Sequence, residues 1–165
     1  MRVLLAGLPG TGKSTLAAAL AAHRPALVLS KDTVRAALFG PHWVEYSSDQ
    51  DEFVMNLLLQ TARWWEAQKP EAIIIFDGRT FAYRAQREQV QADRMIWCVC
   101  PRETARARLT AATGHPAADR DFALYERVEA RFEPVTEPHL LVDTSRPLAE
   151  CVAEAVAYVR SQPHA

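Results

Sequence analysis

The first fifteen residues constrain the fold more than any other part of the chain. An apolar run, Val3–Ala6, leads directly into a glycine-rich segment, and an alanine-rich stretch of good helix formers follows. The segment between them matches the pattern G-x-x-x-x-G-K-[ST], whose glycines let consecutive backbone N–H groups surround a phosphate. A strand before this loop and a helix after it are the context that the motif requires. The positive end of the helix dipole is then expected to point at the bound anion.

The side chains of this loop have separate expected roles. Lys13 is placed to reach the β- and γ-phosphate oxygens of a nucleotide, and the Ser14 hydroxyl is placed to ligate Mg²⁺. We therefore predict that ATP and Mg²⁺ bind here. The residues expected to hold the nucleotide are Gly7, Pro9, Gly10, Thr11, Gly12, Lys13, Ser14 and Thr15. A dinucleotide-binding loop fits less well, because it would need a third glycine where Thr15 stands.

Length and charge narrow the class of protein. A chain of 165 residues corresponds to about one domain, which we predict to span residues 1–165. The net charge of −1 gives no overall attraction for nucleic acid or for an anionic membrane. The sequence contains no apolar stretch of about 18 residues and no signal-peptide pattern, so we expect a soluble, cytoplasmic protein without a membrane partner.

The remaining apolar runs predict an α/β fold. Four short runs follow the first one, and helical stretches separate them: 27–29, 72–76, 95–99 and 140–142. Their apolar character is continuous rather than alternating, which is typical of strands buried on both faces of a parallel sheet. Amphipathic helices are predicted over about 49–68 and 148–159. In such a sheet the ligand lies at the carboxyl ends of the strands, where polar residues follow each run.

The second strand is followed by a carboxylate and an arginine, Asp32 and Arg35. If a helix begins near Asp32, this spacing places both side chains on one face of its first turn, facing the phosphate-binding loop. Asp32 is then a candidate catalytic carboxylate and Arg35 a candidate anchor for a second substrate. The alternative is an ordinary helix cap at Asp32 followed by an exposed arginine.

The third strand also ends in polar residues. Asp77 stands where a carboxylate can hold a Mg²⁺-bound water, although an aspartate before a glycine also suits a simple turn. Arg79 is a candidate contact for the phosphate acceptor. Arg84 and Arg87 suit either contact with an anionic acceptor or a solvated helix face, and we favour the solvated face for both.

Further arginines and one tryptophan complete the candidate set. A stretch rich in Ala, Gly, His and Pro at about 110–120 predicts a mobile lid, with Arg108 and Arg120 flanking it as cations over the transferring phosphoryl group. By analogy with the fold, Arg146 and Pro147 are placed to sandwich an adenine ring. Trp43 lies in a loop-like stretch between helices and is a candidate acceptor contact.

Taken in order along the chain, these motifs resemble those of the small P-loop kinases of the AAA-type ATP-binding group. That group includes zeta toxin, chloramphenicol phosphotransferase and polynucleotide kinase relatives, and the chain is more loosely similar to adenylate, shikimate and gluconate kinases. The resemblance implies a five-stranded parallel sheet in the order 2-3-1-4-5, helices on both faces, a small lid, and ATP-dependent transfer to a hydroxyl group. It also implies that Asp32 orients or deprotonates the acceptor hydroxyl, that Arg35 anchors the acceptor, and that Arg108 covers adenine or phosphate. Relatives often carry another lid arginine where this chain has Thr113.

Three functions remain open at this point. The first is a Mg²⁺- and ATP-dependent kinase acting on a hydroxyl of a small molecule. The second is a polynucleotide 5′-hydroxyl kinase, which would use the same Asp32 and Arg35 but is disfavoured by the acidic segment at 45–52. The third is a nucleotide-dependent switch or binding protein that transfers no phosphoryl group.

Overall fold

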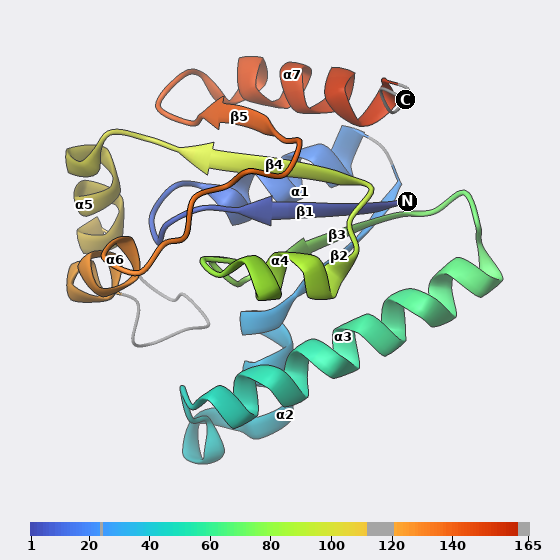
Figure 1. The fold of residues 1–165 in the computed structure, drawn as a ribbon, viewed down its shortest axis with the longest axis horizontal. Helices are drawn as coiled ribbons and strands as arrows, with labels where there is room; N and C mark the ends of the chain where they lie inside the picture. Colours follow the sequence, from blue (N-terminus) through green and yellow to red (C-terminus); the bar gives the residue numbers. More distant parts are fainter. Residues whose placement is uncertain (24, 112–120, 162–165) are drawn as a thin grey trace.

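The centre of the molecule is a parallel β-sheet of five strands (Figure 1). The computed structural model describes residues 1–23, 25–111 and 121–161. The strands are β1 (Arg2–Ala6), β2 (Ala26–Ser30), β3 (Ile73–Asp77), β4 (Arg94–Val99) and β5 (Leu140–Asp143), in the spatial order β2-β3-β1-β4-β5. The predicted α/β class, strand order and parallel pairing are therefore confirmed.

Seven described helices surround the sheet: α1 (Lys13–His23), α2 (Lys31–Trp43), α3 (Ser48–Gln68), α4 (Arg84–Val90), α5 (Arg102–Ala111), α6 (Phe122–Glu129) and α7 (Leu148–Arg160). The helices α1 and α7 pack on one face, and α3 and α4 cover the other, while α5 and α6 lie beyond the carboxyl end of β4 (Figure 1). The predicted helices at 49–68 and 148–159 correspond to α3 and α7. None of the described helices combines the length and apolar character needed to cross a membrane.

Two buried clusters explain why the strand sequences are continuously apolar. Successive side chains of a strand point to opposite faces of a sheet. Leu5 accordingly packs with α1 and α7, whereas its neighbour Leu4 packs with α3. Both are at most 1% exposed. A polar residue at either position would face a core without water. The alternation of polar and apolar residues that is typical of a half-solvated strand is therefore absent here.

Arg87 departs from the prediction that it lies on a solvated helix face. Its side chain is buried, and its Nε donates to Glu137 Oε1 at 2.8 Å. Its two terminal nitrogens donate to three backbone carbonyl oxygens, those of Phe81, Ala82 and Pro134. The helical period alone could not identify these partners, because they lie in loops on either side of α4. Arg84, in contrast, is exposed, and its guanidinium group pairs with Glu88 on the helix surface, as predicted.

We expect Arg87→Met to lower the free energy of unfolding by about 2–4 kcal/mol, because it leaves buried carbonyl groups and Glu137 without their cationic partner. The matched control is Arg84→Met in the same helix, which removes an exposed i,i+4 pair and should cost less than about 0.5 kcal/mol. Urea denaturation of the two variants measures the difference. Equal losses in both would contradict the structural role assigned to Arg87.

Candidate active site

The glycine-rich segment Gly7–Thr15, called the P-loop below, comprises the loop after β1 and the first three residues of α1. Gly7 has a φ of 144°, and a Cβ atom there would lie 2.3 Å from the carbonyl oxygen of Cys98 in β4. Only glycine fits this close approach. Lys13 is buried, and its Nζ donates to the carbonyl oxygens of Gly7 and Leu8, at 2.8 Å in each case. The Lys13 side chain therefore folds back onto the start of the P-loop.

Two cavities flank the P-loop, one on each side. The first, called the acceptor cavity below, has a volume of about 290 Å³ and is lined by Pro9, Lys13 and Ser14 of the loop together with Asp32 and residues of other elements. The second, called the donor cavity below, has a volume of about 440 Å³ and is lined on the loop side by Gly10, Gly12 and Thr15. The loop thus contributes different residues to two separate spaces.

The start of α2 brings Asp32 to the acceptor cavity. Ser30, and not Asp32, caps this helix, because the Ser30 hydroxyl oxygen accepts from the Thr33 backbone N–H. The carboxylate of Asp32 is therefore not used as a cap, which was the alternative left open by the sequence. Its Oδ1 atom lies 3.4 Å from Lys31 Nζ. Asp32 and Arg35 both line the cavity, as their spacing on one helical face predicted.

Gly78 sets the distance between β3 and the start of α2. It has a φ of 80°, and a Cβ atom there would lie 2.8 Å from the backbone nitrogens of both Lys31 and Asp32. A side chain at this position would be strained and would also push the first turn of α2 away from the sheet. The glycine after β3 therefore helps to place Asp32 relative to the P-loop.

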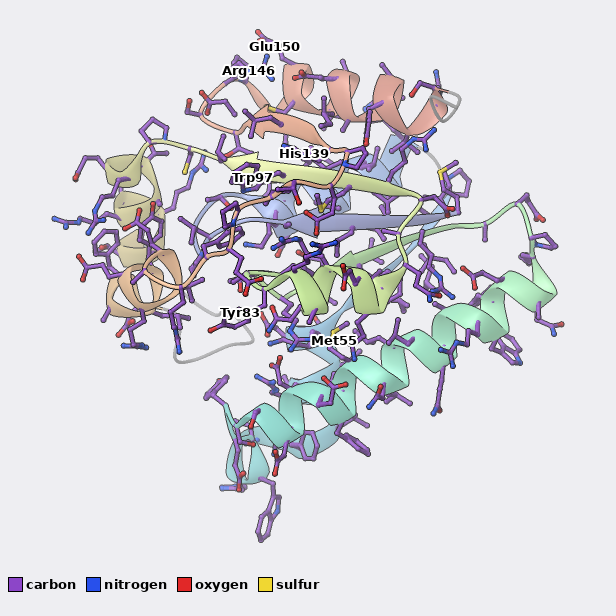
Figure 2. The ribbon with its side chains drawn as sticks, in the orientation of Figure 1. Met55, Tyr83, Trp97, His139, Arg146 and Glu150 are labelled. Atoms are coloured by element: carbon purple, nitrogen blue, oxygen red, sulfur yellow. The ribbon has the colours of Figure 1, made fainter. Side chains whose placement is uncertain are left out.

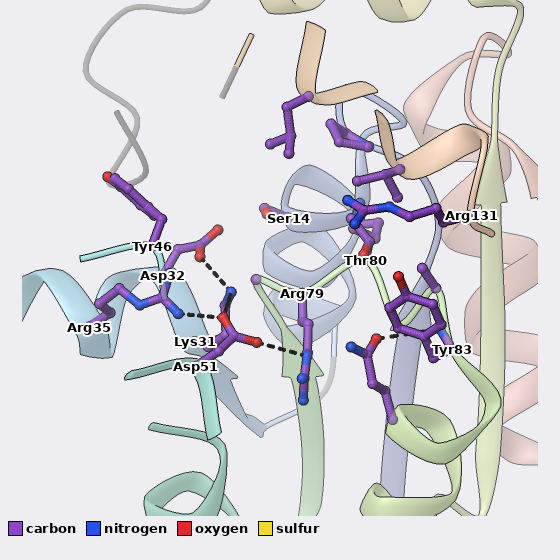
Figure 3. A pocket seen from close by; sticks show the side chains of 17 residues that line it. Ser14, Lys31, Asp32, Arg35, Tyr46, Asp51, Arg79, Thr80, Tyr83 and Arg131 are labelled. Carbon is purple, nitrogen blue, oxygen red and sulfur yellow. Dashed lines mark hydrogen bonds and ion pairs between the residues drawn. The ribbon is translucent and has the colours of Figure 1, made fainter. Parts of the chain in front are cut away.

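Asp51, in the first turn of α3, is the ionic centre of the acceptor cavity (Figure 3). Its Oδ1 atom accepts from Lys31 Nζ at 2.6 Å and also pairs with Arg35, while its Oδ2 atom lies 3.0 Å from Arg79 Nε. Burial raises the pKa of Asp51, but the three neighbouring cations lower it by more, so the pKa lies below its ordinary value. The carboxylate thus remains ionised and holds cations from α2 and from the loop after β3.

Replacement of Asp51 with asparagine is expected to destabilise the protein at neutral pH by about 2 kcal/mol, and by less as the medium is acidified. The pKa of Asp51 is lower in the folded protein than its value of about 4 in the unfolded chain. Its ionic contribution is therefore fully present above about pH 4 and is lost as the pH falls through the folded-state pKa. Urea denaturation of wild type, Asp51→Asn and the exposed control Asp49→Asn from about pH 7 to pH 3.5 measures this change. A wild-type advantage that stays constant over this range would contradict the prediction.

Asp77 and Ser14 supply oxygen atoms suited to Mg²⁺. Asp77 ends β3 and is only 2% exposed, yet its Oδ1 atom has no hydrogen-bond partner among the described residues. A buried carboxylate oxygen without a partner is costly unless a ligand or water satisfies it. Mg²⁺ prefers hard oxygen ligands and commonly takes one or two from the protein and the rest from water and phosphate. The oxygen atoms of Asp77 and Ser14 therefore suit Mg²⁺.

The donor cavity is bounded by α5 and by the turn after β5. Arg108 donates to the carbonyl oxygen of Thr144 at 2.8 Å and to its hydroxyl at 3.0 Å, so its guanidinium group is held at the cavity wall. Arg146 also lines this cavity and pairs with Glu154 on α7, whereas Pro147 does not line it. Figure 2 shows Arg146 well separated from Tyr83, which lines the acceptor cavity.

Five predicted residues of the described chain line neither cavity: Gly7, Thr11, Trp43, Asp77 and Pro147. Trp43 does not line the acceptor cavity and is 78% exposed. It follows a kink in α2, where Gly40 has a φ of 58° and Pro41 interrupts the helical hydrogen bonding. The predicted lid spans about 110–120. Thr110 and Ala111 end helix α5, whereas the rest of the lid, including Thr113 and Arg120, lies outside the described residues.

Several cavity residues were not singled out from the sequence. They are Lys31, Asp51, Thr80, Tyr83 and Arg131. Lys31 carried a usable signal, because it precedes Asp32 and lies one helical turn before Arg35. Asp51 was noted only as part of an acidic segment. Arg131 follows α6 and lies almost a hundred residues from Asp32 along the chain, so no local pattern connects them.

A family comparison agrees with this geometry. Residues 3–135 match the model of a family described as the AAA domain. The chain belongs to the AAA domain family. No curated protein sequence matches this AAA domain significantly.

Solved structures resemble this AAA domain over nearly its whole length. A presumed kinase from Chloroflexus aurantiacus is 25% identical with a TM-score of 0.71, and the alignment covers 95% of this chain and 97% of that one. Shikimate kinase from Bacteroides thetaiotaomicron is 15% identical with a TM-score of 0.70, covering 98% and 99%. A gluconokinase from Sinorhizobium meliloti is 17% identical with a TM-score of 0.68, covering 96% and 90%. The AAA domain thus has the kinase-like P-loop fold of these small-molecule kinases.

Proposed function

We propose that the protein transfers the γ-phosphoryl group of ATP to a hydroxyl group of a small molecule. The observation that carries this proposal is that Asp32 lines the same cavity as Lys13 and Ser14 of the P-loop. Beside a phosphate a carboxylate is repelled unless it serves Mg²⁺, and Asp77 is the candidate for that task, so Asp32 is left without a role toward the nucleotide. It suits an acceptor hydroxyl instead.

In the proposed reaction the acceptor oxygen forms a bond to the γ-phosphorus of ATP. The bond between that phosphorus and the oxygen bridging to the β-phosphate breaks, and ADP leaves. Asp32 accepts the proton of the hydroxyl group and afterwards returns it to solvent. Because the transition state of such transfers is loose, most of the rate enhancement is expected from positioning and from the charge of Lys13 and nearby arginines.

We assign one substrate to each cavity. The P-loop backbone would bind the phosphates, and the donor cavity beside Arg108 and Arg146 suits the nucleoside part of ATP. Ser14 and Asp77 would hold Mg²⁺, Asp77 through a bound water, and the ion supplies positive charge to the β- and γ-phosphates when present. The acceptor cavity, at about 290 Å³, is at the small end of ligand sites, which favours a small molecule over a polymer.

The test is a transfer assay with γ-labelled ATP, Mg²⁺ and a panel of sugars, hydroxy acids, nucleosides and antibiotics, with a 5′-hydroxyl oligonucleotide alongside. We expect label in a small-molecule product. Label only in the oligonucleotide would instead establish the polynucleotide kinase function, and nucleotide-dependent binding of a partner without any transfer would favour a switch protein. Lys13→Ala serves as the background for every acceptor.

A further inference from the structure

The charge that lines the acceptor cavity differs from that of the chain as a whole. The whole chain has a net charge of −1. Apart from Lys13, which serves the donor side, the described lining contains four cationic side chains and two carboxylates. The cations are Lys31, Arg35, Arg79 and Arg131, and the carboxylates are Asp32 and Asp51. An excess of two positive charges therefore faces the space that the acceptor would enter.

The internal ion pairs do not neutralise this charge. Lys31, Arg35 and Arg79 share the carboxylate of Asp51, and Lys31 also lies 3.4 Å from Asp32 Oδ1. The side chain of Arg35 is only 4% exposed, so water does little to compensate for its charge. Its Nε atom is buried without a hydrogen-bond partner, although the guanidinium group lies 5.5 Å from the ring centre of Tyr46. Three largely buried cations beside two carboxylates keep an excess positive charge, which is costly unless a further anion completes the cluster.

Arg131 supplies a cation from the other side of the cavity. It follows α6, and its Nε donates to the carbonyl oxygen of Arg127 at 3.0 Å. Figure 3 shows its guanidinium group and the carboxylate of Asp32 pointing toward each other across the cavity. The terminal nitrogens of an arginine form a planar pair of donors that matches a carboxylate or a phosphate. Arg131 and the Asp51 cluster thus approach the same space from different elements.

We propose that the phosphate acceptor is itself an anion, a small hydroxy compound carrying a carboxylate or phosphate group that binds Arg131 and the cations held by Asp51. This inference rests on the proposed function and specifies its substrate class. The hydroxyl group of the acceptor lies toward Asp32 and its anionic group toward the arginines.

The surroundings favour a small anion over a polyanion. A neighbouring hollow shares Tyr46, Asp51, Arg79 and Gln86 with the acceptor cavity, and it is also lined by Asp49 and Glu52. These carboxylates would repel a chain of phosphates that continued out of the cavity. A single anionic group fits within the cationic part and leaves this acidic surface uncovered.

The test measures binding with the P-loop filled, so that an added anion cannot occupy it. In a saturating Mg²⁺ complex of a nonhydrolysable ATP analogue, which also fills the γ-phosphate position, glycerate, glycerol phosphate and glycerol are titrated by calorimetry into wild type, Arg131→Gln and the control Arg127→Gln. Arg127 is exposed in α6 one turn before Arg131 and does not line the cavity. We expect at least one anion to bind about ten-fold or more tightly than glycerol to wild type and control, and Arg131→Gln to lose most of that advantage.

Each outcome decides between alternatives. The tighter of the two anions identifies the group as a carboxylate or a phosphate. Equal binding of glycerol and both anions, absence of binding by either anion, or an unchanged anion preference in Arg131→Gln would overturn the inference. So would a variant that loses affinity only for a nonhydrolysable ATP analogue, because Arg131 would then serve the γ-phosphate. If the anion preference holds but no acceptor is ever phosphorylated, the proposed function fails while the anion site stands.

Discussion

Lys13→Ala is expected to reduce MgATP turnover at least about 100-fold, because the variant lacks the one P-loop side chain that can place a positive charge at the β- and γ-phosphates. Lys13 is buried and lines the acceptor cavity, and its Nζ already lies within the loop, bonded to two of the loop's carbonyl oxygens. Steady-state release of ADP measures the loss.

The control for Lys13 is Lys69→Ala. Lys69 follows α3, far from the P-loop along the chain, and its nearest described aromatic partner is Trp65. This variant should retain wild-type turnover. Circular dichroism of both variants separates a catalytic loss from unfolding, and a folded Lys13→Ala protein with wild-type turnover would refute nucleotide hydrolysis or transfer at the P-loop.

Asp32→Asn should bind MgATP with wild-type affinity. With an identified acceptor, it should transfer the γ-phosphoryl group about 10²–10⁴-fold more slowly than wild type. Asparagine preserves the size of the side chain and removes its ability to accept a proton. Because Ser30 caps α2, the substitution leaves the helix terminus intact. Nucleotide affinity is measured by calorimetry and transfer by single-turnover kinetics, so that the two effects are read separately.

Glu103→Gln is the matched control for Asp32. Glu103 lies in the first turn of α5, as Asp32 lies in the first turn of α2, but it is exposed and lines neither cavity. It should leave both quantities unchanged. Full transfer activity in Asp32→Asn would remove the assignment of Asp32 as the base.

The sheet was predictable because its central strands are buried on both faces, which leaves a continuous apolar signature such as Ile73–Phe76. The P-loop was predictable because its function depends on spacing along a contiguous segment. The strand order came from the resemblance to P-loop kinases, since no local pattern specifies which strands pair.

The ionic contacts of the site were harder to predict from the sequence. The contacts of Asp51 with Lys31, Arg35 and Arg79 join three elements, and nothing in α3 alone distinguishes Asp51 from Asp49. Arg87 differs from the predicted surface residue because its partners, Glu137 and backbone carbonyl oxygens before α4 and before β5, come from loops outside its helix. Contacts of this kind depend on tertiary packing, which periodicity does not encode.

Because the P-loop borders both cavities, different segments of the chain line each of them. Most of the acceptor cavity is lined from residues 31–86, whereas the donor cavity takes its lining from residues 10–16, 108–109 and 144–151. A gene library that randomises only cavity positions within 31–86, with Asp32 kept, would therefore vary the compound that is phosphorylated while the nucleotide-binding elements keep their sequence. Under the proposed function, this makes the protein a scaffold on which new acceptors can be selected without selecting again for ATP.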